Sequence, residues 1–349
     1  MTKKTIAILF GGHSAEYEVS LKSAYAVINS LNYDRYKPVL IGITREGEWL
    51  KYSGPYDKII HDTWQLDQSC VRAFLSPSRC TRGLIELHDD GILETTIDAA
   101  FPVMHGRYGE DGTVQGLLEL AGIPIIGCDS LSSSLCMDKA IAHTVVQAAG
   151  IRVAASITAD RSLSVADITA QTAGLQYPLF VKPLRAGSSF GISMVQEQSE
   201  LVYAIDLAFQ HDSRIIIEER IEGFEVGCAV LGKDELVIGE VDEIELSDRF
   251  FDYKEKYSLA SSKIHMPARI DAGTAEAIKH TAAIIYRALR CSGFARVDLF
   301  LTPQGELVFN EVNTIPGFTP HSRYPNMLRG IGMTFEEIVN RLISEAMNP

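Results

Sequence analysis

The chain has 349 residues, of which 46% are apolar and 22% are charged, and its formal net charge is −13. This composition is typical of a globular protein long enough to form two or three domains. The acidic balance argues against a general nucleic-acid-binding protein, because such a protein needs a basic surface to neutralise phosphates.

The chain shows neither an export signal nor a membrane span. The start, MTKKTIAILF, turns to GGHSAEYE too soon for the apolar region of a signal peptide. Every apolar run falls short of the roughly 20 residues that a membrane helix needs. The six cysteines are scattered without a CxxC pair, which favours reduced thiols over a disulfide or a zinc site. We therefore expect a cytoplasmic protein with no membrane partner.

The first part of the chain alternates strand and helix patterns. Short apolar runs predict buried strands at residues 5–10, 37–44, 99–104 and 123–126. Apolar residues at helical spacing predict helices at 21–31 and 114–121. This rhythm indicates an α/β unit over residues 1–127, with a parallel sheet covered by helices. Residues 52–95 are weakly patterned and support no prediction.

The later part of the chain mixes shorter strands with helices, which is typical of an α+β architecture. Strands are predicted at 179–182, 192–195, 214–219, 226–231, 236–245, 295–301 and 307–313. Helices are predicted at 139–149, 272–289 and 335–346. Changes of pattern near 127–130 and 223 divide this part into two domains, 128–223 and 224–349.

A glycine-rich loop is the best candidate for phosphate binding. The segment Gly11 to Glu16 does not match GxGxxG, and the usual GxxxxGK[ST] loop does not occur in the sequence. Residues 185–191, RAGSSFG, follow Lys182 and lie between two predicted strands. Their glycines let the backbone approach phosphate oxygens, and the lysine adds positive charge. The same pattern also fits a flexible hairpin with a solvated lysine.

A second candidate is a polar face on the last predicted hairpin. Arg296 and Asp298 share one face of a strand, as Glu311 and Asn313 do on the next. A tight turn at residues 302–305 would place Arg296 opposite Glu311. Two carboxylates and an amide suit Mg²⁺, which takes few protein ligands besides substrate oxygens. The alternative is a solvated face carrying an Arg–Glu pair.

Together these pieces resemble the D-alanine–D-alanine ligases, which belong to the ATP-grasp enzymes. The resemblance rests on GGHSAEYEVSLKSA, HGRYGEDGTVQGLLEL, LCMDK, PLFVKPLRAGSSFGI, FDYKEKY, FARVDLF and FNEVNTIPGFTPHSRYP, in this order. It implies a Rossmann-like N-terminal domain and two α+β domains that hold ATP between antiparallel sheets. It also implies a homodimer that serves peptidoglycan precursor synthesis.

The resemblance assigns roles to individual residues. Catalytic roles fall on Glu16, Ser188, Tyr257, Arg296 and Gly317. Substrate-binding roles fall on His105, Lys256, Ser322 and Arg323. Contacts with ATP fall on Lys139, Lys182, Ser189, Glu218, Glu219, Ile221 and Glu225. Two Mg²⁺ or Mn²⁺ ions would be held by Asp298, Glu311 and Asn313.

The implied chemistry joins two D-amino acids through an acyl phosphate. ATP activates the carboxylate of the first substrate, whose ammonium group Glu16 receives and which His105 helps to orient. The amine of the second substrate then attacks, and Arg296 with the N–H of Gly317 stabilises the oxyanion. Tyr257, hydrogen-bonded to Ser188, closes a loop that excludes water from the reactive intermediate.

The second substrate is predicted from fewer residues. Tyr257 fits an amine nucleophile rather than D-lactate, and Arg323 is typical of the vancomycin-resistance ligases. Together the two residues resemble the VanG-type D-alanine–D-serine branch, in which an arginine could bond a serine hydroxyl. Either Phe250 or Phe251 would shape this subsite. The alternative second substrate is another D-alanine, as in the housekeeping enzymes.

One departure from the family pattern and three competing functions remain. Pro320 stands where the family commonly has serine, and it removes a backbone donor. The competing functions are an ATP-grasp ligase for other substrates, a nicotinamide dehydrogenase and a nucleotide-binding sensor without catalysis. Glu16, His105, Tyr257 and Ser322 argue against other ligase substrates. The missing GxGxxG argues against a dehydrogenase, and the complete lysine and metal set argues against a sensor.

Overall fold

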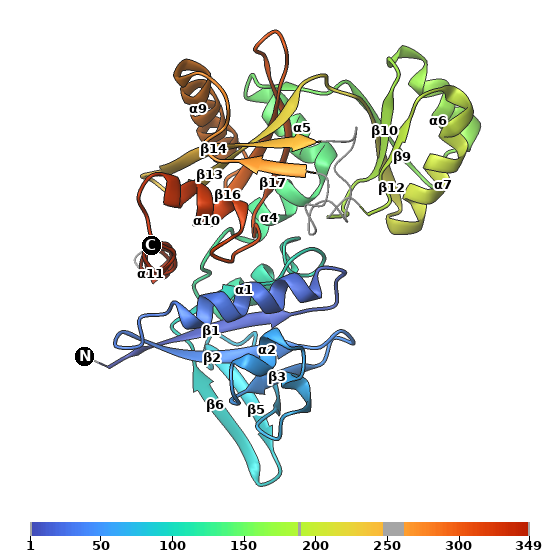
Figure 1. The fold of residues 1–349 in the computed structure, drawn as a ribbon. Coiled ribbons are helices and arrows are strands. Elements are labelled where there is room, and N and C mark those ends of the chain that lie inside the picture. Colours follow the sequence, from blue (N-terminus) through green and yellow to red (C-terminus); the bar gives the residue numbers. More distant parts are fainter. Residues whose placement is uncertain (1, 188–189, 247–261, 348–349) are drawn as a thin grey trace.

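The computed structural model describes residues 2–187, 190–246 and 262–347, and it contains three β-sheets with helices packed around them (Figure 1). One sheet forms the N-terminal part of the molecule. The other two lie in the opposite part and are built from residues 152–313. Among the described helices, none is long and apolar enough to cross a membrane.

The N-terminal sheet has a parallel centre, as the sequence predicts. Strand β1 (Lys4–Gly11) pairs in parallel with β2 (Tyr36–Ile43) and β7 (Ala99–Pro102). Helix α1 (Tyr17–Asn29) follows β1, and α3 (Thr113–Ala121) follows β7. The even residues of β1 pack into one apolar core and the odd residues into another. Burial of both faces is what a central parallel strand requires.

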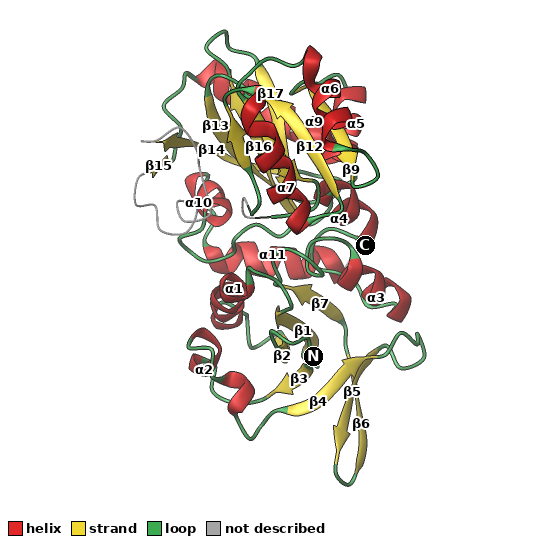
Figure 2. Cartoon of the chain, turned by 90° about the vertical axis from the view of Figure 1, so that its right-hand side faces the viewer, coloured by secondary structure: helices red, strands yellow, loops and turns green. Residues whose placement is uncertain are grey.

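Antiparallel strands extend this sheet through the weakly patterned region. They are β3 (Trp49–Tyr52), β4 (Val71–Leu75), β5 (Gly83–His88) and β6 (Gly91–Thr96). A short helix, α2 (Asp57–Ile60), lies between β3 and β4. In Figure 2 the β5–β6 hairpin projects from the body of the molecule. The strand predicted at residues 123–126 is wrong, because only one isolated bridge, Ala100 to Ile125, forms there.

The second sheet is antiparallel and is covered by helices on one face. Its strand order is β11 (Ser193–Val195), β10 (Leu179–Pro183), β12 (Arg214–Glu219) and β9 (Ser156–Asp160). Leu179 and Val181 pack with α6 (Val165–Gln171) and α7 (Leu201–His211) in one core. Because side chains alternate along a strand, Lys182 points to the other face of the sheet.

The third sheet brings the C-terminal half together with an earlier segment. Its strand order is β15 (Ser262–His265), β14 (Val237–Leu246), β13 (Phe224–Leu231), β16 (Phe294–Leu301), β17 (Leu307–Asn313) and β8 (Arg152–Val153). Helices α4 (Ser130–Met137), α5 (Lys139–Ala148) and α9 (Ala272–Ala288) share one core with this sheet. Helix α10 (Arg323–Gly330) contacts β13 and β14.

Aromatic side chains join the N-terminal sheet to the third sheet. Phe101 of β7 contacts Phe294 of β16 and Phe318, with ring centroids 5.8 and 5.7 Å apart. Helix α11 (Phe335–Met347) packs into the same core. All six cysteines lie in the described part of the chain and are free thiols, as predicted.

Candidate active site

The polar hairpin forms, but its register differs from the predicted one. Asp298 lies opposite Glu311, and Arg296 lies opposite Asn313. The shift is two residues: one comes from the turn, in which Thr302 bonds with Glu306, and one comes from a bulge after Asp298. An even shift keeps side chains on the same face. The predicted pairing of Arg296 with Glu311 is therefore wrong, whereas their common face is confirmed.

Asp298 is the buried centre of this face. It is buried, and the guanidinium of Arg296 donates to its Oδ1 over 2.8 Å and to its Oδ2 over 2.6 Å. The side-chain amide of Asn313 donates to Oδ2 over 2.9 Å. A buried carboxylate is stable only with such partners. The oxygens of Asp298, Glu311 and Asn313 form a donor set that fits a magnesium-like cation, which would share Asp298 with Arg296.

Arg323 reaches the same face from the start of α10. Its Nε and Nη2 donate to the two carboxylate oxygens of Asp242 over 2.7 and 2.8 Å. Its Nη1 donates to Glu225 over 3.1 Å, and its Nη2 lies 3.4 Å from Asp298. Any side chain at Gly227 would collide with this guanidinium, since a Cβ there would lie 2.4 Å from Nη2. Arg323 is thus fixed by carboxylates above the sheet.

The two predicted phosphate-binding lysines lie on β10 and at the start of α5. Lys182 of β10 forms an ion pair with the buried Glu218 of β12. Lys139, at the start of α5, donates to the carbonyl of Ala186 over 3.1 Å and lies 4.0 Å from Glu311. The predicted phosphate loop and the predicted metal hairpin therefore meet at Lys139. Of two other predicted nucleotide contacts, Glu219 ends β12 and accepts the N–H of Gln176 over 2.8 Å, and Ile221 follows that strand.

The carboxylate of Glu16 lies between the N-terminal domain and the phosphate loop. Added Cβ atoms on Gly106 and Gly187 would lie 2.5 and 2.9 Å from its Oε2. Both glycines therefore leave room for this carboxylate. A residue just before α1 thus reaches the loop that follows Lys182.

His105 is buried with both ring nitrogens engaged. Nδ1 lies 2.7 Å from the carbonyl of Ile315, and Nε2 lies 3.1 Å from the hydroxyl of Ser23. A carbonyl only accepts, so Nδ1 carries the proton in this assignment. Burial lowers the pKa of His105, which favours the neutral ring. The ring therefore contacts protein groups on both sides, and the contact with substrate that the resemblance implies stays a prediction.

Gly317 and Ser322 lie side by side. A Cβ at Gly317 would lie 3.2 Å from the hydroxyl oxygen of Ser322. That oxygen accepts a hydrogen bond of 3.1 Å from the N–H of Thr319, and Ser322 precedes α10. Pro320 is exposed between them, so it leaves this contact intact. Other predicted residues lie outside the described part of the chain: Ser188, Ser189, Phe250, Phe251, Lys256 and Tyr257.

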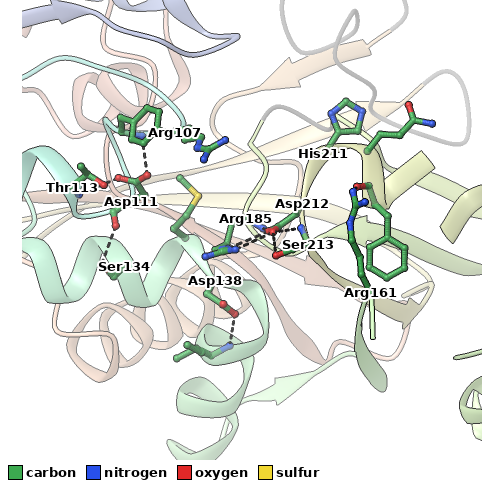
Figure 3. A pocket seen from close by; sticks show the side chains of 15 residues that line it. Arg107, Asp111, Thr113, Ser134, Asp138, Arg161, Arg185, His211, Asp212 and Ser213 are labelled. Atoms are coloured by element: carbon green, nitrogen blue, oxygen red, sulfur yellow. Dashed lines mark hydrogen bonds and ion pairs between the residues drawn. The ribbon is translucent and has the colours of Figure 1, made fainter. Parts of the chain in front are cut away.

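A cavity of about 680 Å³ borders the phosphate loop (Figure 3). Arg185 lines it and donates to both carboxylate oxygens of Asp212 over 3.2 and 3.0 Å. Asp138 lies on its wall and caps α5 through the N–H of Ile141. Neither the hairpin carboxylates nor Lys182 line this cavity. It therefore adjoins the candidate active site without containing its charged centre.

Sequence reasoning misses two acidic residues of this region. Asp242 holds Arg323, and Glu110 accepts hydrogen bonds from the N–H groups of Gly106 and Ile315 over 2.7 and 3.0 Å. Burial, together with the nearby charge of Glu16, raises the pKa of Glu110 to about 8. The only signal for Asp242 is an acidic residue inside an apolar strand pattern. Glu110 stands in the HGRYGEDG motif, which gives it no role by itself.

Comparisons with known proteins define the class to which this site belongs. Residues 5–128 match the family model for the D-Ala-D-Ala ligase N-terminus, and residues 145–344 match the model for its C-terminus. The crystal structure of the VanG D-Ala:D-Ser ligase from Enterococcus faecalis is 55% identical, with a TM-score of 0.93, and the match covers 99% of this chain and 100% of that chain.

The chain is also similar to curated relatives over nearly its whole length. The putative D-alanine–D-lactate ligase of Streptomyces coelicolor is 42% identical, and the match covers 99% of both chains. The vancomycin/teicoplanin A-type resistance protein VanA of Enterococcus faecium is 43% identical, with the same coverage.

The fold and the match define an ATP-dependent ligase with the ATP-grasp fold. The chain belongs to the D-alanine–D-alanine ligase family. Its members use ATP and a divalent metal to join D-alanine to a second substrate. The predicted family and fold class are thereby confirmed.

Proposed function

We propose that the protein joins D-alanine to D-serine through a D-alanyl phosphate intermediate. The observation that carries this proposal is the buried Arg323, which Asp242 and Glu225 hold beside the polar hairpin. The similarity to a solved D-Ala:D-Ser ligase supports it. The alternative is a housekeeping D-alanine–D-alanine ligase, which would share the nucleotide and metal residues.

The charged groups are arranged for phosphoryl transfer. Lys139 and Lys182 would bind ATP phosphates, and Lys182 would exchange its contact with Glu218 for a phosphate oxygen. A carboxylate oxygen of the first D-alanine attacks the γ-phosphorus, ADP leaves, and an acyl phosphate forms. Two Mg²⁺ or Mn²⁺ ions on Asp298, Glu311 and Asn313 would neutralise phosphate charge during this step.

The second step places negative charge on the former carbonyl oxygen. The free amine of the second substrate attacks the acyl phosphate, and the tetrahedral intermediate then expels inorganic phosphate and loses a proton from the new amide nitrogen. Arg296 and the N–H of Gly317 would donate to the oxyanion, which forms only as bonding proceeds. Glu16 would hold the ammonium group of the first substrate, while Lys256 and Ser322 would bind the carboxylate of the second.

The preference for D-serine follows from what its hydroxyl would meet. A guanidinium has five N–H donors, and carboxylates already occupy most of those on Arg323. Asp242 and Glu225 add acceptor oxygens at the same place. A hydroxyl can donate to these oxygens or accept from a remaining N–H, directly or through water, whereas the methyl group of D-alanine can do neither. One such bond supplies a preference of about 1 kcal/mol.

Product analysis tests this function directly. Phosphate release is measured with ATP and Mg²⁺ for D-alanine alone, for D-alanine with D-serine and for D-alanine with D-lactate, and the products are identified by mass. We expect D-alanyl-D-serine to dominate. If D-alanyl-D-alanine is the only product, the ligase chemistry stands and the proposed specificity is wrong. If phosphate release does not depend on D-amino acids, the proposed function is wrong.

The biological setting and organisation are part of the same proposal. A D-alanyl-D-serine product would serve peptidoglycan precursor synthesis and vancomycin resistance in the cytoplasm. We also propose the three domains 1–127, 128–223 and 224–349, and a homodimer. Light scattering of the purified protein tests the homodimer, and a mass of one chain would contradict it.

A further inference from the structure

The backbone of Ile315 is held on both sides by the N-terminal part of the molecule. Its N–H donates to Oε1 of Glu110 over 3.0 Å, and its carbonyl accepts from Nδ1 of His105 over 2.7 Å. Ile315 lies midway between Asn313, a proposed metal ligand, and Gly317, a proposed oxyanion donor. Both backbone polar groups of Ile315 therefore depend on side chains more than 200 positions earlier in the chain.

The groups that hold Ile315 are themselves fixed. The other carboxylate oxygen of Glu110 accepts the N–H of Gly106 over 2.7 Å, which closes the loop that carries both holding residues. The hydroxyl of Ser23 lies 3.1 Å from Nε2 of His105 and accepts the N–H of Phe318 over 3.2 Å. The turn is thus anchored at Ile315 and at Phe318, on either side of Gly317.

We propose that Glu110 and His105 are positioning residues that clamp Ile315 and thereby fix the N–H of Gly317 where the oxyanion develops. This inference rests on the proposed function, because it assigns the oxyanion role to Gly317. Oxyanion stabilisation depends on donors that are already in place when charge appears. A small displacement of the reacting groups is costly for the rate. The clamp also connects the loop that carries His105 and Glu110 to residues 313–318, which follow the polar hairpin.

Contacts that position the turn for the transition state have different effects from contacts that only link two domains. Loss of the clamp should lower kcat while leaving ATP binding nearly unchanged, because Lys139 and Lys182 lie on other elements. Loss of contacts that only link two domains should lower the free energy of unfolding and weaken the binding of all substrates together. Glu119 offers a matched control, because its two carboxylate oxygens accept from the N–H and the hydroxyl of Ser130 over 2.9 and 2.7 Å, away from the turn.

The test uses Glu110→Gln and His105→Asn in the full chain, with Glu119→Gln as the control. The amide nitrogen of glutamine cannot accept an N–H, so Glu110→Gln must lose one of its two bonds. His105→Asn weakens the clamp from the other side. We expect kcat to fall about 10- to 100-fold in both variants, with KM for ATP within about twofold. Amide hydrogen exchange should accelerate in residues 313–318, and the control should change neither quantity.

Three results would overturn the proposal. The first is a kcat in both variants within about twofold of the unchanged protein. The second is a loss of kcat accompanied by an equal loss of ATP affinity. The third is faster exchange throughout the chain rather than in residues 313–318. If the unchanged protein shows no ligase activity, the proposed function fails first, and the exchange measurement then still reports whether Glu110 and His105 hold the turn.

Discussion

The guanidinium of Arg296 donates to both carboxylate oxygens of Asp298, two positions further along the same strand. The pair is nearly enclosed, with side-chain exposures of 12% and 1%. Because the fork of an arginine matches a carboxylate in two places, its position is better defined than that of a lysine. The fixed guanidinium is what an oxyanion donor requires.

Arg296→Lys therefore tests geometry separately from charge. The lysine still compensates Asp298, so the fold should survive, but the two-point contact is lost. We expect kcat to fall about 10²- to 10³-fold, as for the loss of one oxyanion donor. Arg152→Lys is the control, because Arg152 pairs with Glu306 on the surface. Equal kcat values for Arg296→Lys and Arg152→Lys would show that Arg296 takes no part in the catalytic step.

Lys182→Ala tests the nucleotide end of the site. Lys182 is the cation of β10 that pairs with Glu218, and its loss removes positive charge from the proposed phosphate position. We expect kcat/KM for ATP to fall at least about 100-fold, with calorimetry showing weaker ATP binding. Thermal unfolding checks the fold, since Glu218 loses its partner. Lys58→Ala is the surface control, and near-normal ATP use by Lys182→Ala would contradict the assignment.

Glu311→Gln tests the metal end of the same face. The neutral amide keeps the shape of the side chain but binds a divalent cation less strongly than a carboxylate does. Phosphate release should fall at least about 100-fold, and raising the Mg²⁺ concentration should restore part of it. Glu306→Gln, at an exposed position near the start of the same strand, is the matched control. A variant with normal activity and normal Mg²⁺ dependence would exclude Glu311 as a ligand.

Arg323→Leu tests specificity, but the contacts of Arg323 complicate that single change. Leucine would leave the buried Asp242 without its partner, at a cost of about 3–5 kcal/mol. The pair Asp242→Asn with Arg323→Leu removes both charges together and is the cleaner test. We expect the D-serine to D-alanine product ratio to fall about fivefold, equivalent to about 1 kcal/mol. Arg329→Leu, on the same helix, should keep the ratio; an unchanged ratio in the double variant would show that this network does not set specificity.

Much of this site follows from local patterns in the sequence. Alternation along two strands is enough to put Asp298 and Glu311 on one face, because a two-residue error in register does not move side chains to the other face. The pairing itself depends on a bulge and on how the turn closes, and neither leaves a clear mark in residues 302–305. The central parallel strands are predicted well, because burial on both faces makes them continuously apolar.

The rest depends on contacts between distant segments. Asp242 and Arg323 are 81 positions apart, and only packing of α10 on the sheet brings them together. Glu110 and Ile315 are 205 positions apart, so no local pattern relates them. The antiparallel strands in residues 52–95 are half exposed and short, which gives weak periodicity, whereas the apolar run at 123–126 packs against Ala100 without forming a strand.

The carboxyl group of Glu110 should make stability depend on pH. Its pKa is about 8 in the folded protein against an ordinary value of 4.5, so the folded state keeps a proton that the unfolded chain releases. The free energy of unfolding should therefore decrease as pH rises from about 4.5 to about 8. The test is urea unfolding of metal-free and ligand-free protein at several pH values. For Glu110→Gln, the decrease in the free energy of unfolding that Glu110 causes between about pH 4.5 and 8 should be absent. Parallel pH profiles for the variant and the unchanged protein would contradict the assignment.

Phe294 should carry much of the connection between the N-terminal sheet and the third sheet. It is fully buried, and its ring centroid lies 5.8 Å from that of Phe101, 5.2 Å from that of Phe318 and 5.7 Å from that of Tyr324. Phe294→Ala removes these contacts and leaves a cavity, so urea unfolding should show a loss of about 3–5 kcal/mol. Phe74→Ala, at a side chain that is 44% exposed, should cost less than about 1 kcal/mol. Equal losses for the two variants would mean that the aromatic junction relaxes around the cavity and contributes little to holding the two parts together.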